Sequence, residues 1–356
     1  MAMSRPPVAV PASLLVVAGR VEARLDALLQ SEAARWADLS LDLAPPLESL
    51  RRLVMDGGKR LRPAFCFWGY VGAGGDPESD EIIAAGAAFE MLQAFALVHD
   101  DVMDGSSTRR GNRTAHLEFD DRHADAAWRG EGRRFGEGVA ILIGDLAHVY
   151  ADQLLPRTSP AVQRVWDELR VELNVGQYLD LLGTARADTD HESARRIARY
   201  KSGKYTIERP LHVGAALAGR LDDLEAPLSA YGDPLGEAFQ LRDDLLGAFG
   251  DEDLTGKPVG DDLREGKPTP LLAAATSAAS TAERRVLDEV GQPDLSLQRI
   301  GAIQEVLVTT GAVDAMEALI DSLTGQALDA IATADISEDA RAALVELAHF
   351  VAWRRT

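Results

Sequence analysis

The run Ile82–Val98 is the feature that most restricts the fold of this chain. It is long and apolar enough to suggest a membrane span, but it contains Glu90 and Gln93 and leads directly into Asp100. A buried helix of a large helical domain fits this pattern better than a span does. The sequence therefore predicts a core helix here and no stable membrane insertion.

The composition favours an all-α protein. The 356 residues are 46% hydrophobic and only 6% aromatic, and few segments show the alternation of a β-strand. Further stretches with helical spacing are expected at residues 21–43, 47–55, 63–71, 139–155, 162–182, 192–200, 206–219 and 228–249. We expect a loop over 109–134 and a break at Gly203. Residues 1–12 are Pro-rich and expected to be disordered, and 13–356 are expected to form a single helical domain.

The charge and the cysteine content limit partners and compartment. The formal net charge is -20, which argues against nucleic acid as a partner. Cys66 is the sole cysteine, so no intrachain disulfide can form, and no signal peptide is read at the N-terminus. A cytoplasmic protein is expected.

The apolar run ends in the sequence DDVMD. Asp100 and Asp104 are four residues apart, so on a helix they lie on one face, separated by a rise of about 6 Å. Like charges at this spacing destabilise a helix unless a cation lies between them. Oxygen ligands without His or Cys suit Mg²⁺. A solvated acidic helix end is the alternative interpretation.

A second acidic cluster and a set of cations extend this prediction. Asp243 and Asp244 also follow an apolar helical run, in FQLRDD. We expect the two clusters to face each other across a cavity. The chain has only five lysines, all in short Gly-rich or polar segments: Lys59, Lys201, Lys204, Lys257 and Lys267. Carboxylates, Mg²⁺, Arg forks and Lys point charges together predict a site for a diphosphate, and the apolar helix beneath predicts a hydrocarbon tail.

These segments resemble the trans-isoprenyl diphosphate synthase family, also called polyprenyl synthetases. The resemblance runs from GGKRLRP at 57–63 through DDVMD, TRRG and FQLRDD to EGKPT at 265–269, in the same order. It implies a single-domain bundle of long antiparallel helices around a central active-site cavity, and a homodimer. It also implies Mg²⁺-dependent condensation of isopentenyl diphosphate with an allylic diphosphate.

The resemblance assigns roles to individual residues. It places Mg²⁺ at Asp100, Asp104 and Asp243, assisted by Asp101 and Asp244. It gives the isopentenyl diphosphate head to Lys59, Arg62, Gln93 and Arg110, and the allylic diphosphate to Arg109, Lys201 and Lys257. Lys267 belongs to a loop that closes over the site, Ser202 stands where Thr is frequent, and Gln177, Asp180 and Gln240 line the cavity.

The second motif departs from the family pattern. It reads DDLLG, so Gly247 stands where an Asp is usual and the carboxylate at that position is missing. Asp251 follows two turns after Asp243. Because Asp243 carries most of the coordination in the family, activity is expected to survive.

Product length is expected to follow the depth of the apolar tunnel. Phe95 is about 7.5 Å down the helix from Asp100, and the next residue, Ala96, is small. In the family this combination resembles synthases of C20 products, so geranylgeranyl diphosphate is expected, with farnesyl diphosphate as the alternative. A core Phe without a gating role also fits. His99 is interpreted as structural.

Three other classes of protein share parts of the pattern. A terpene cyclase has the first motif, but would replace the second with an Asn/Ser/Glu triad and has no use for GGKRLRP. A non-catalytic subunit of a heteromeric synthase usually loses aspartates from the first motif, whereas this chain keeps all three. A helical scaffold protein would not explain where the lysines lie.

Overall fold

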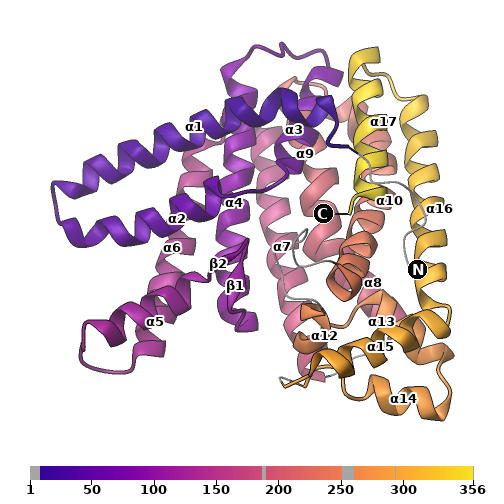
Figure 1. The fold of residues 1–356 in the computed structure, drawn as a ribbon. Helices are drawn as coiled ribbons and strands as arrows, with labels where there is room; N and C mark the ends of the chain where they lie inside the picture. The colour runs from indigo at the N-terminus through magenta and orange to yellow at the C-terminus, as the bar shows by residue number, and fades with distance from the viewer. Residues whose placement is uncertain (1–8, 187–189, 251–259, 293, 356) are drawn as a thin grey trace. The chain divides into compact units, whose positions relative to one another are not determined.

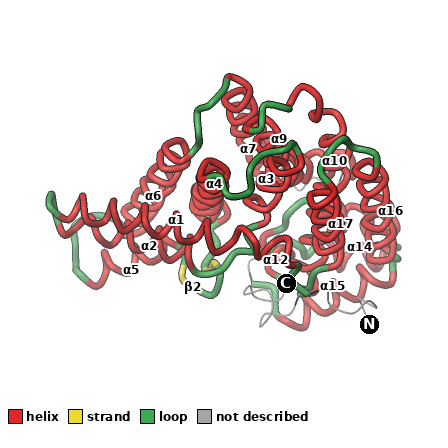
Figure 2. Tube along the Cα trace, turned by 90° about the horizontal axis from the view of Figure 1, so that it is seen from above, coloured by secondary structure: helices red, strands yellow, loops and turns green. Residues whose placement is uncertain are grey.

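The computed structural model describes residues 9–186, 190–250, 260–292 and 294–355, and nearly all of this chain is helical (Figure 2). Contacts divide it into two compact units. Unit 1 comprises the described parts of Met1–Ser13, Trp68–Gly75 and Ser159–Thr356, and unit 2 comprises Leu14–Phe67 and Asp76–Thr158. The all-α prediction is confirmed, whereas the single-domain boundaries stay a prediction.

Unit 2 is built around a long buried helix, α4 (Asp80–Asp104). The other elements of this unit are α1 (Ala12–Ala37), η1 (Leu41–Leu43), α2 (Ala44–Met55), α3 (Leu61–Gly72), β1 (Thr108–Arg109), β2 (Asn112–Arg113), α5 (Ala115–Asp125) and α6 (Gly132–Leu154) (Figure 1). The first residues of α1 and the last residues of α3 belong to unit 1. Helix α4 packs against α6, and α6 packs against α5. The buried side chains of α4 include Phe89, Met91 and Leu92.

Helix α4 begins and ends where the sequence provides caps. The Ser79 side chain accepts a hydrogen bond from the Glu81 N–H at the start, and Gly105 adopts φ 67° at the end. Among the described residues, α4 is the one helix apolar enough to cross a membrane, with a mean hydropathy of 1.6 over its most apolar window. Because 67% of that window is buried inside the protein, α4 has the packing expected of a core helix.

The expected loop over 109–134 is more ordered than the sequence suggested. Strands β1 and β2 pair in antiparallel fashion, with Arg110 and Gly111 as a two-residue turn. Both turn residues have positive φ, 53° and 75°, as a tight hairpin requires. Helix α5 follows at once and packs against α6, with His116, Phe119 and His123 as its buried residues.

Unit 1 is built around α10 (Leu221–Phe249), which packs against α16 and α17. The other elements are α7 (Pro160–Arg186), α8 (His191–Ala198), η2 (Arg199–Glu208), α9 (Arg209–Leu217), α12 (Asp261–Glu265), α13 (Pro270–Ala278), α14 (Thr281–Leu287), α15 (Leu297–Thr309), α16 (Ala312–Ala332) and α17 (Glu338–Trp353). Helix α10 starts earlier than the sequence suggested and continues through Pro227 and Pro234.

The break expected at Gly203 is wrong. The chain continues there as a ten-residue π-helix, η2, and the Arg209 N–H donates to the carbonyl of Lys204, five residues back. Gly203 allows the backbone of η2 to lie close to the backbone of α10. A Cβ built on Gly236 of α10 would lie 2.7 Å from the Gly203 Cα. On the other side, a Cβ on Gly176 of α7 would lie 2.4 Å from the Lys201 nitrogen.

Candidate active site

The first aspartate motif occupies the last turn of α4, in unit 2. Oxygens of Asp100 and Asp104 lie within 4.8 Å of one another, and both residues are half-buried. Two carboxylates at the C-terminal end of a helix repel each other and the negative end of the helix dipole. The pair is therefore arranged to receive a cation.

Arg109 lies beside this pair, because the hairpin folds back onto the end of α4. Its guanidinium donates from Nε to Oδ1 of Asp101 at 2.9 Å, and its Nη2 lies 3.8 Å from Oδ2 of Asp100. Asp101 is buried. The structure thus shows Asp101 orienting Arg109, and an assisting role of Asp101 in metal binding stays a prediction.

Arg110 connects the hairpin to the Gly57-Gly58 loop. Its Nη1 donates to the carbonyls of Leu53 at 2.6 Å and Gly57 at 3.1 Å. Burial lowers the pKa of Arg110, Glu90 opposes this effect, and the guanidiniums of Arg60, Arg109 and Arg62 lower the pKa further. A concentration of positive charge in unit 2 is a suitable environment for an anion such as a diphosphate.

The other predicted residues of unit 2 lie on α3, on α4 and in the loop before α3. Lys59 is half-buried in the loop before α3, and Arg62 lies in the first turn of α3. Gln93, Phe95 and Ala96 are half-buried on α4.

Phe95 is fixed between two imidazole rings. The ring of His148 on α6 stacks on it with centroids 4.8 Å apart, and His99 meets it edge-on at 4.8 Å. Nε2 of His99 also lies 3.0 Å from the carbonyl oxygen of Ile141. These contacts support the structural interpretation of His99.

The second aspartate motif lies near the end of α10, in unit 1. Asp243 is half-buried, whereas the Asp244 side chain is buried. Gln240 donates to Oδ1 of Asp244 at 2.8 Å. Burial raises the pKa of Asp244 well above its ordinary value. The hydrogen bond from Gln240 lowers this pKa, whereas the carboxylates of Asp262, Asp243 and Asp180 raise it further.

Lys201 and Asp180 form an ion pair between η2 and α7. The Lys201 Nζ lies 2.5 Å from Oδ2 of Asp180, which is buried. Gln177 lies one turn before Asp180, and Ser202 follows Lys201; both are half-buried. The lysine is therefore held in place by the close approach of η2 to α7.

Lys267 follows α12, and its Nζ lies 2.5 Å from Oε2 of Glu265. The predicted Lys257, and Asp251 as a substitute carboxylate, lie outside the described residues.

The sequence analysis missed two features of unit 1. Arg354 is buried near the C-terminus, donates through Nη2 to Oδ1 of Asp243, and stacks on Phe239. No local pattern marks this pair, because the two residues lie far apart in the sequence.

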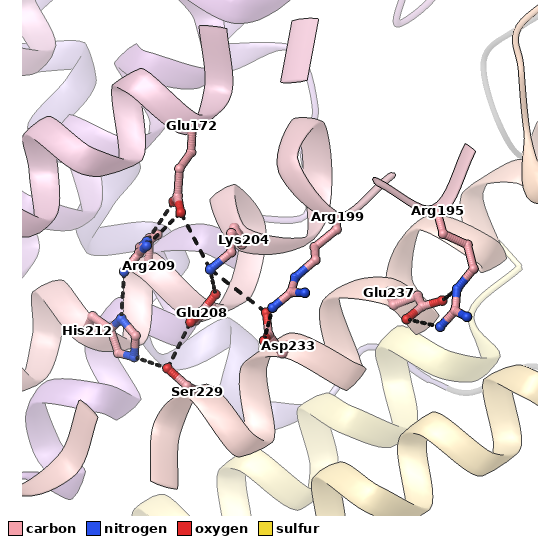
Figure 3. Close-up of polar contacts among 10 residues, drawn as sticks. All are labelled: Glu172, Arg195, Arg199, Lys204, Glu208, Arg209, His212, Ser229, Asp233 and Glu237. Carbon is pink, nitrogen blue, oxygen red and sulfur yellow. Dashed lines mark hydrogen bonds and ion pairs between the residues drawn. The ribbon is translucent and has the colours of Figure 1, made fainter. Parts of the chain in front are cut away.

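The second missed feature is a buried ionic network around η2 (Figure 3). The Lys204 Nζ lies 2.8 Å from Glu208 and 3.5 Å from Glu172 of α7, and Arg209 donates to Glu172 at 2.7 Å. Burial raises the pKa of Glu208, but hydrogen bonds from Lys204 and Ser229 outweigh it, so that pKa is below its ordinary value. The sequence signal that could have indicated this network is the scarcity of lysine, because Lys204 is one of only five lysines in the chain.

The residues present fit a divalent metal. The donors of both motifs are carboxylate oxygens, the set that hard ions such as Mg²⁺ prefer. Asp100 and Asp104 form an acceptor pair at one turn's spacing. In the described part of the chain, Oδ2 of the buried Asp244 accepts no hydrogen bond.

Comparisons with known proteins identify the family of the chain. Residues 46–307 match the family model described as polyprenyl synthetase. The geranylfarnesyl diphosphate synthase of Aeropyrum pernix is 32% identical over 74% of this chain and 80% of that protein. A (2E,6E)-farnesyl diphosphate synthase of Mycobacterium tuberculosis is 32% identical over 84% of this chain and 80% of that protein.

A similar fold has been solved for a geranylgeranyl pyrophosphate synthase of Corynebacterium glutamicum, complexed with isoprenyl diphosphate and magnesium. The TM-score is 0.89 at 37% identity, over 94% of this chain and 98% of that one. The fold is therefore the all-α fold of isoprenyl diphosphate synthases. The chain belongs to the polyprenyl synthetase family, and it is a prenyltransferase of the isoprenyl diphosphate synthase type.

Proposed function

We propose that this chain condenses isopentenyl diphosphate with an allylic diphosphate head to tail (1'-4), with Mg²⁺, and that the main all-trans product is geranylgeranyl diphosphate. The Asp100–Asp104 pair beside Arg109 carries the proposal, because it combines a metal-binding geometry with a cation that can bind phosphate oxygens. The Corynebacterium glutamicum relative, solved with isoprenyl diphosphate and magnesium, supports it.

The chain's cations act on the leaving diphosphate. Mg²⁺, when bound, neutralises part of the diphosphate charge. Arg109 offers a fork of N–H donors and Lys201 a point charge, so both stabilise the departing group as the C–O bond ionises. Lys257 is proposed to contribute a third cation.

The second substrate is held by a different set of cations. Lys59, Arg62 and Arg110 are proposed to bind the isopentenyl head, with Gln93 as a hydrogen-bonding neighbour. The double bond of isopentenyl diphosphate attacks the allylic cation. Apolar surroundings exclude the water that would otherwise capture that cation. The released diphosphate then takes the proton, so no histidine base is needed.

Phe95 is proposed to limit the product at C20. Its contacts with His99 and His148 hold the ring in one orientation, and a rigid ring stops a growing chain better than a mobile one. Farnesyl diphosphate is the second candidate product, since the Mycobacterium tuberculosis relative carries that name.

A homodimer in the cytoplasm is also proposed. Helix α6 exposes the large apolar side chains of Ile141 (46%), Leu142 (63%) and Val149 (50%), which a second copy would cover. The single, buried cysteine suits a reducing compartment.

A product assay tests the reaction and the chain length together. Purified protein, Mg²⁺ and labelled isopentenyl diphosphate are incubated with dimethylallyl, geranyl or farnesyl diphosphate, and the products are sized by chromatography. A dominant C20 product is expected. A C15 product would keep the reaction and reject the role of Phe95, whereas no condensation with any primer would reject the function.

A further inference from the structure

Arg60 has a backbone conformation that an arginine rarely adopts. Its φ is 52°, in the left-handed region, and among the described residues only Arg110 and Ala127 are other non-glycine residues with positive φ. Gly57 and Gly58 precede it with φ of 89° and 105°, so the chain turns sharply before α3. A glycine would adopt the conformation of Arg60 without strain. An arginine there indicates that its side chain provides something that a glycine would not.

The Arg60 side chain is buried and bonds to three helices of unit 2. Only 3% of the residue is exposed. Its Nη1 donates to Oε2 of Glu90 on α4 at 2.5 Å, and its Nε donates to Oε1 of Glu22 on α1 at 3.1 Å. Its Nη2 donates to the carbonyl of Val54 on α2 at 2.7 Å. Because every guanidinium nitrogen is bonded within the protein, Arg60 is unsuited to bind a substrate itself.

Glu90 is the counter-ion of Arg60 in the middle of an apolar helix. Only 6% of Glu90 is exposed, and its neighbours Phe89 and Met91 are fully buried. A carboxylate at such a place is costly unless a cation pairs with it. Replacing a buried ion pair by apolar side chains of similar volume is often neutral for stability, so stability alone is a weak reason for this pair.

The backbone of Arg60 connects two residues proposed to bind isopentenyl diphosphate. Lys59 precedes it directly. The Arg60 carbonyl accepts a hydrogen bond from the Ala64 N–H at 3.1 Å, so Arg60 begins the helical hydrogen bonding of α3, whose first turn contains Arg62. The conformation of Arg60 therefore sets the direction from Lys59 to Arg62.

The side chain of Arg60 borders a third residue of that proposed set, Arg110. A Cβ built on Gly58 would lie 3.0 Å from Nη1 of Arg60 and 3.0 Å from Nη2 of Arg110, so both guanidiniums lie against Gly58. Burial lowers the pKa of Arg110, Glu90 raises it, and Arg60 and Arg62 lower it further. Glu90 is thus the carboxylate that offsets this group of cations.

We propose that Arg60 is a positioning residue for isopentenyl diphosphate and that Glu90 is the buried anchor that fixes it. The pair holds the positive-φ turn in one conformation, so that Lys59 before the turn and Arg62 after it direct their charges to the same diphosphate. Arg60 itself contacts no substrate. The inference rests on the proposed condensation, and it concerns the isopentenyl substrate alone.

Removing the pair in two steps separates positioning from stability. Arg60→Met deletes the cation and leaves Glu90 buried without it. Arg60→Met combined with Glu90→Met deletes both charges and keeps apolar bulk, so it remains a test if the single variant does not fold. Arg51→Met is the matched control: Arg51 also joins α2 to α1, through an ion pair with Asp26 at 2.7 Å, but lies outside the turn.

Binding and turnover are measured separately on the full chain. Calorimetry measures the binding of isopentenyl diphosphate without an allylic primer, so no condensation takes place. The condensation assay with Mg²⁺ then gives one KM for isopentenyl diphosphate and one for geranyl diphosphate. Thermal unfolding is recorded for each variant.

Arg60→Met is expected to unfold at a lower temperature and to bind isopentenyl diphosphate about 10-fold more weakly or worse, because small displacements of binding groups are costly. The double variant is expected to regain the wild-type unfolding temperature but not the affinity. In both variants the KM for isopentenyl diphosphate should rise, whereas the KM for geranyl diphosphate should stay near that of the wild type. Arg51→Met should keep both KM values.

Two results would overturn the proposal. One is wild-type affinity for isopentenyl diphosphate in the double variant, which would make the pair a structural tie and nothing more. The other is an equal rise of both KM values, which would indicate a general loosening of the protein. A wild-type protein that binds isopentenyl diphosphate but condenses it with no primer would refute the proposed reaction and leave this inference to the binding data. A wild-type protein that binds none would refute both.

Discussion

Asp100 and Asp104 are placed at the most unfavourable end of α4 for negative charge. We expect Asp100→Ala combined with Asp104→Ala to lower turnover by at least about 1000-fold, because a metal contributes several kcal/mol to stabilising transition-state charge. The fold should remain, since neither side chain is part of the core, and circular dichroism would check this. Asp125→Ala, an exposed change on α5, is the control. Near-normal turnover in the double variant would contradict the metal assignment.

Phe95 allows a second test with one substitution. Phe95→Ala is expected to shift the main product to chains longer than that of the wild type, since the ring that stops the chain is gone. Chromatographic sizing of products measures the shift, and Phe95→Leu, which keeps much of the bulk, should give an intermediate distribution. A product profile identical to that of the wild type would mean that Phe95 is an ordinary core residue.

The η2 element depends on an ionic network that an apolar core would not need. Lys204 is buried between Glu208 and Glu172, so Lys204→Met would leave uncompensated negative charge in the interior. Breaking a buried pair in this way is expected to cost about 3–5 kcal/mol of unfolding free energy. Urea denaturation measures this cost.

The matched variant is Lys204→Met combined with Glu208→Gln. Removing the second charge should recover part of the lost stability, because no buried carboxylate then lacks its cation. If both variants were as stable as the wild type, the network would not contribute to holding η2.

The same network makes η2 and α9 sensitive to acid. Burial lowers the pKa of His212, as does Arg209, while Glu208 and Glu225 oppose this effect. His212 therefore remains neutral in the fold at pH values where the unfolded chain, with a pKa of about 6.5, binds a proton. Stability is lost as the pH falls below about 6.5, by at most about 1.4 kcal/mol per pH unit.

Thermal unfolding at several pH values between 5 and 8 measures this loss. His212→Gln is expected to flatten the curve below about pH 6.5 and to leave the plateau at higher pH lower, since the hydrogen bond to the Glu225 carbonyl is weakened. An unchanged slope in the variant would assign the acid sensitivity to other groups.

The sequence predicted most of the helices, but it missed α5 and did not show which segments contact one another. The ends of α4 and α10 followed from apolar runs that stop at aspartates. The spacing of Asp100 and Asp104 predicted a pair on one helix face, whereas the roles of the other aspartates came from the resemblance to the family. The continuation through Gly203, the pairing of Arg354 with Asp243 and the position of Asp262 could not. Each depends on contacts between segments far apart in the chain, where a local pattern carries no information.

At the scale of the whole molecule, the exposed apolar side chains of α6 are proposed to be covered by a second copy of the chain. We expect Leu142→Glu to convert a dimer into a monomer, because burying a charge in an apolar interface is costly. Light scattering coupled to size-exclusion chromatography measures the mass. Leu41→Glu changes an exposed leucine outside α6 and should remain dimeric. A dimeric Leu142→Glu protein would place the interface elsewhere.

The glycines at the contacts of η2 have a consequence for mutational screens. Gly176 and Gly236 lie where a neighbouring backbone leaves no room for a methyl group, and Gly203 lies where the fit would be tight. In a saturation screen for prenyltransferase activity, these positions should reject most replacements, as the aspartates proposed to bind Mg²⁺ should. Intolerance alone would then fail to separate chemistry from packing. The two classes can be separated by protein abundance, which glycine replacements would reduce and aspartate replacements would leave near normal.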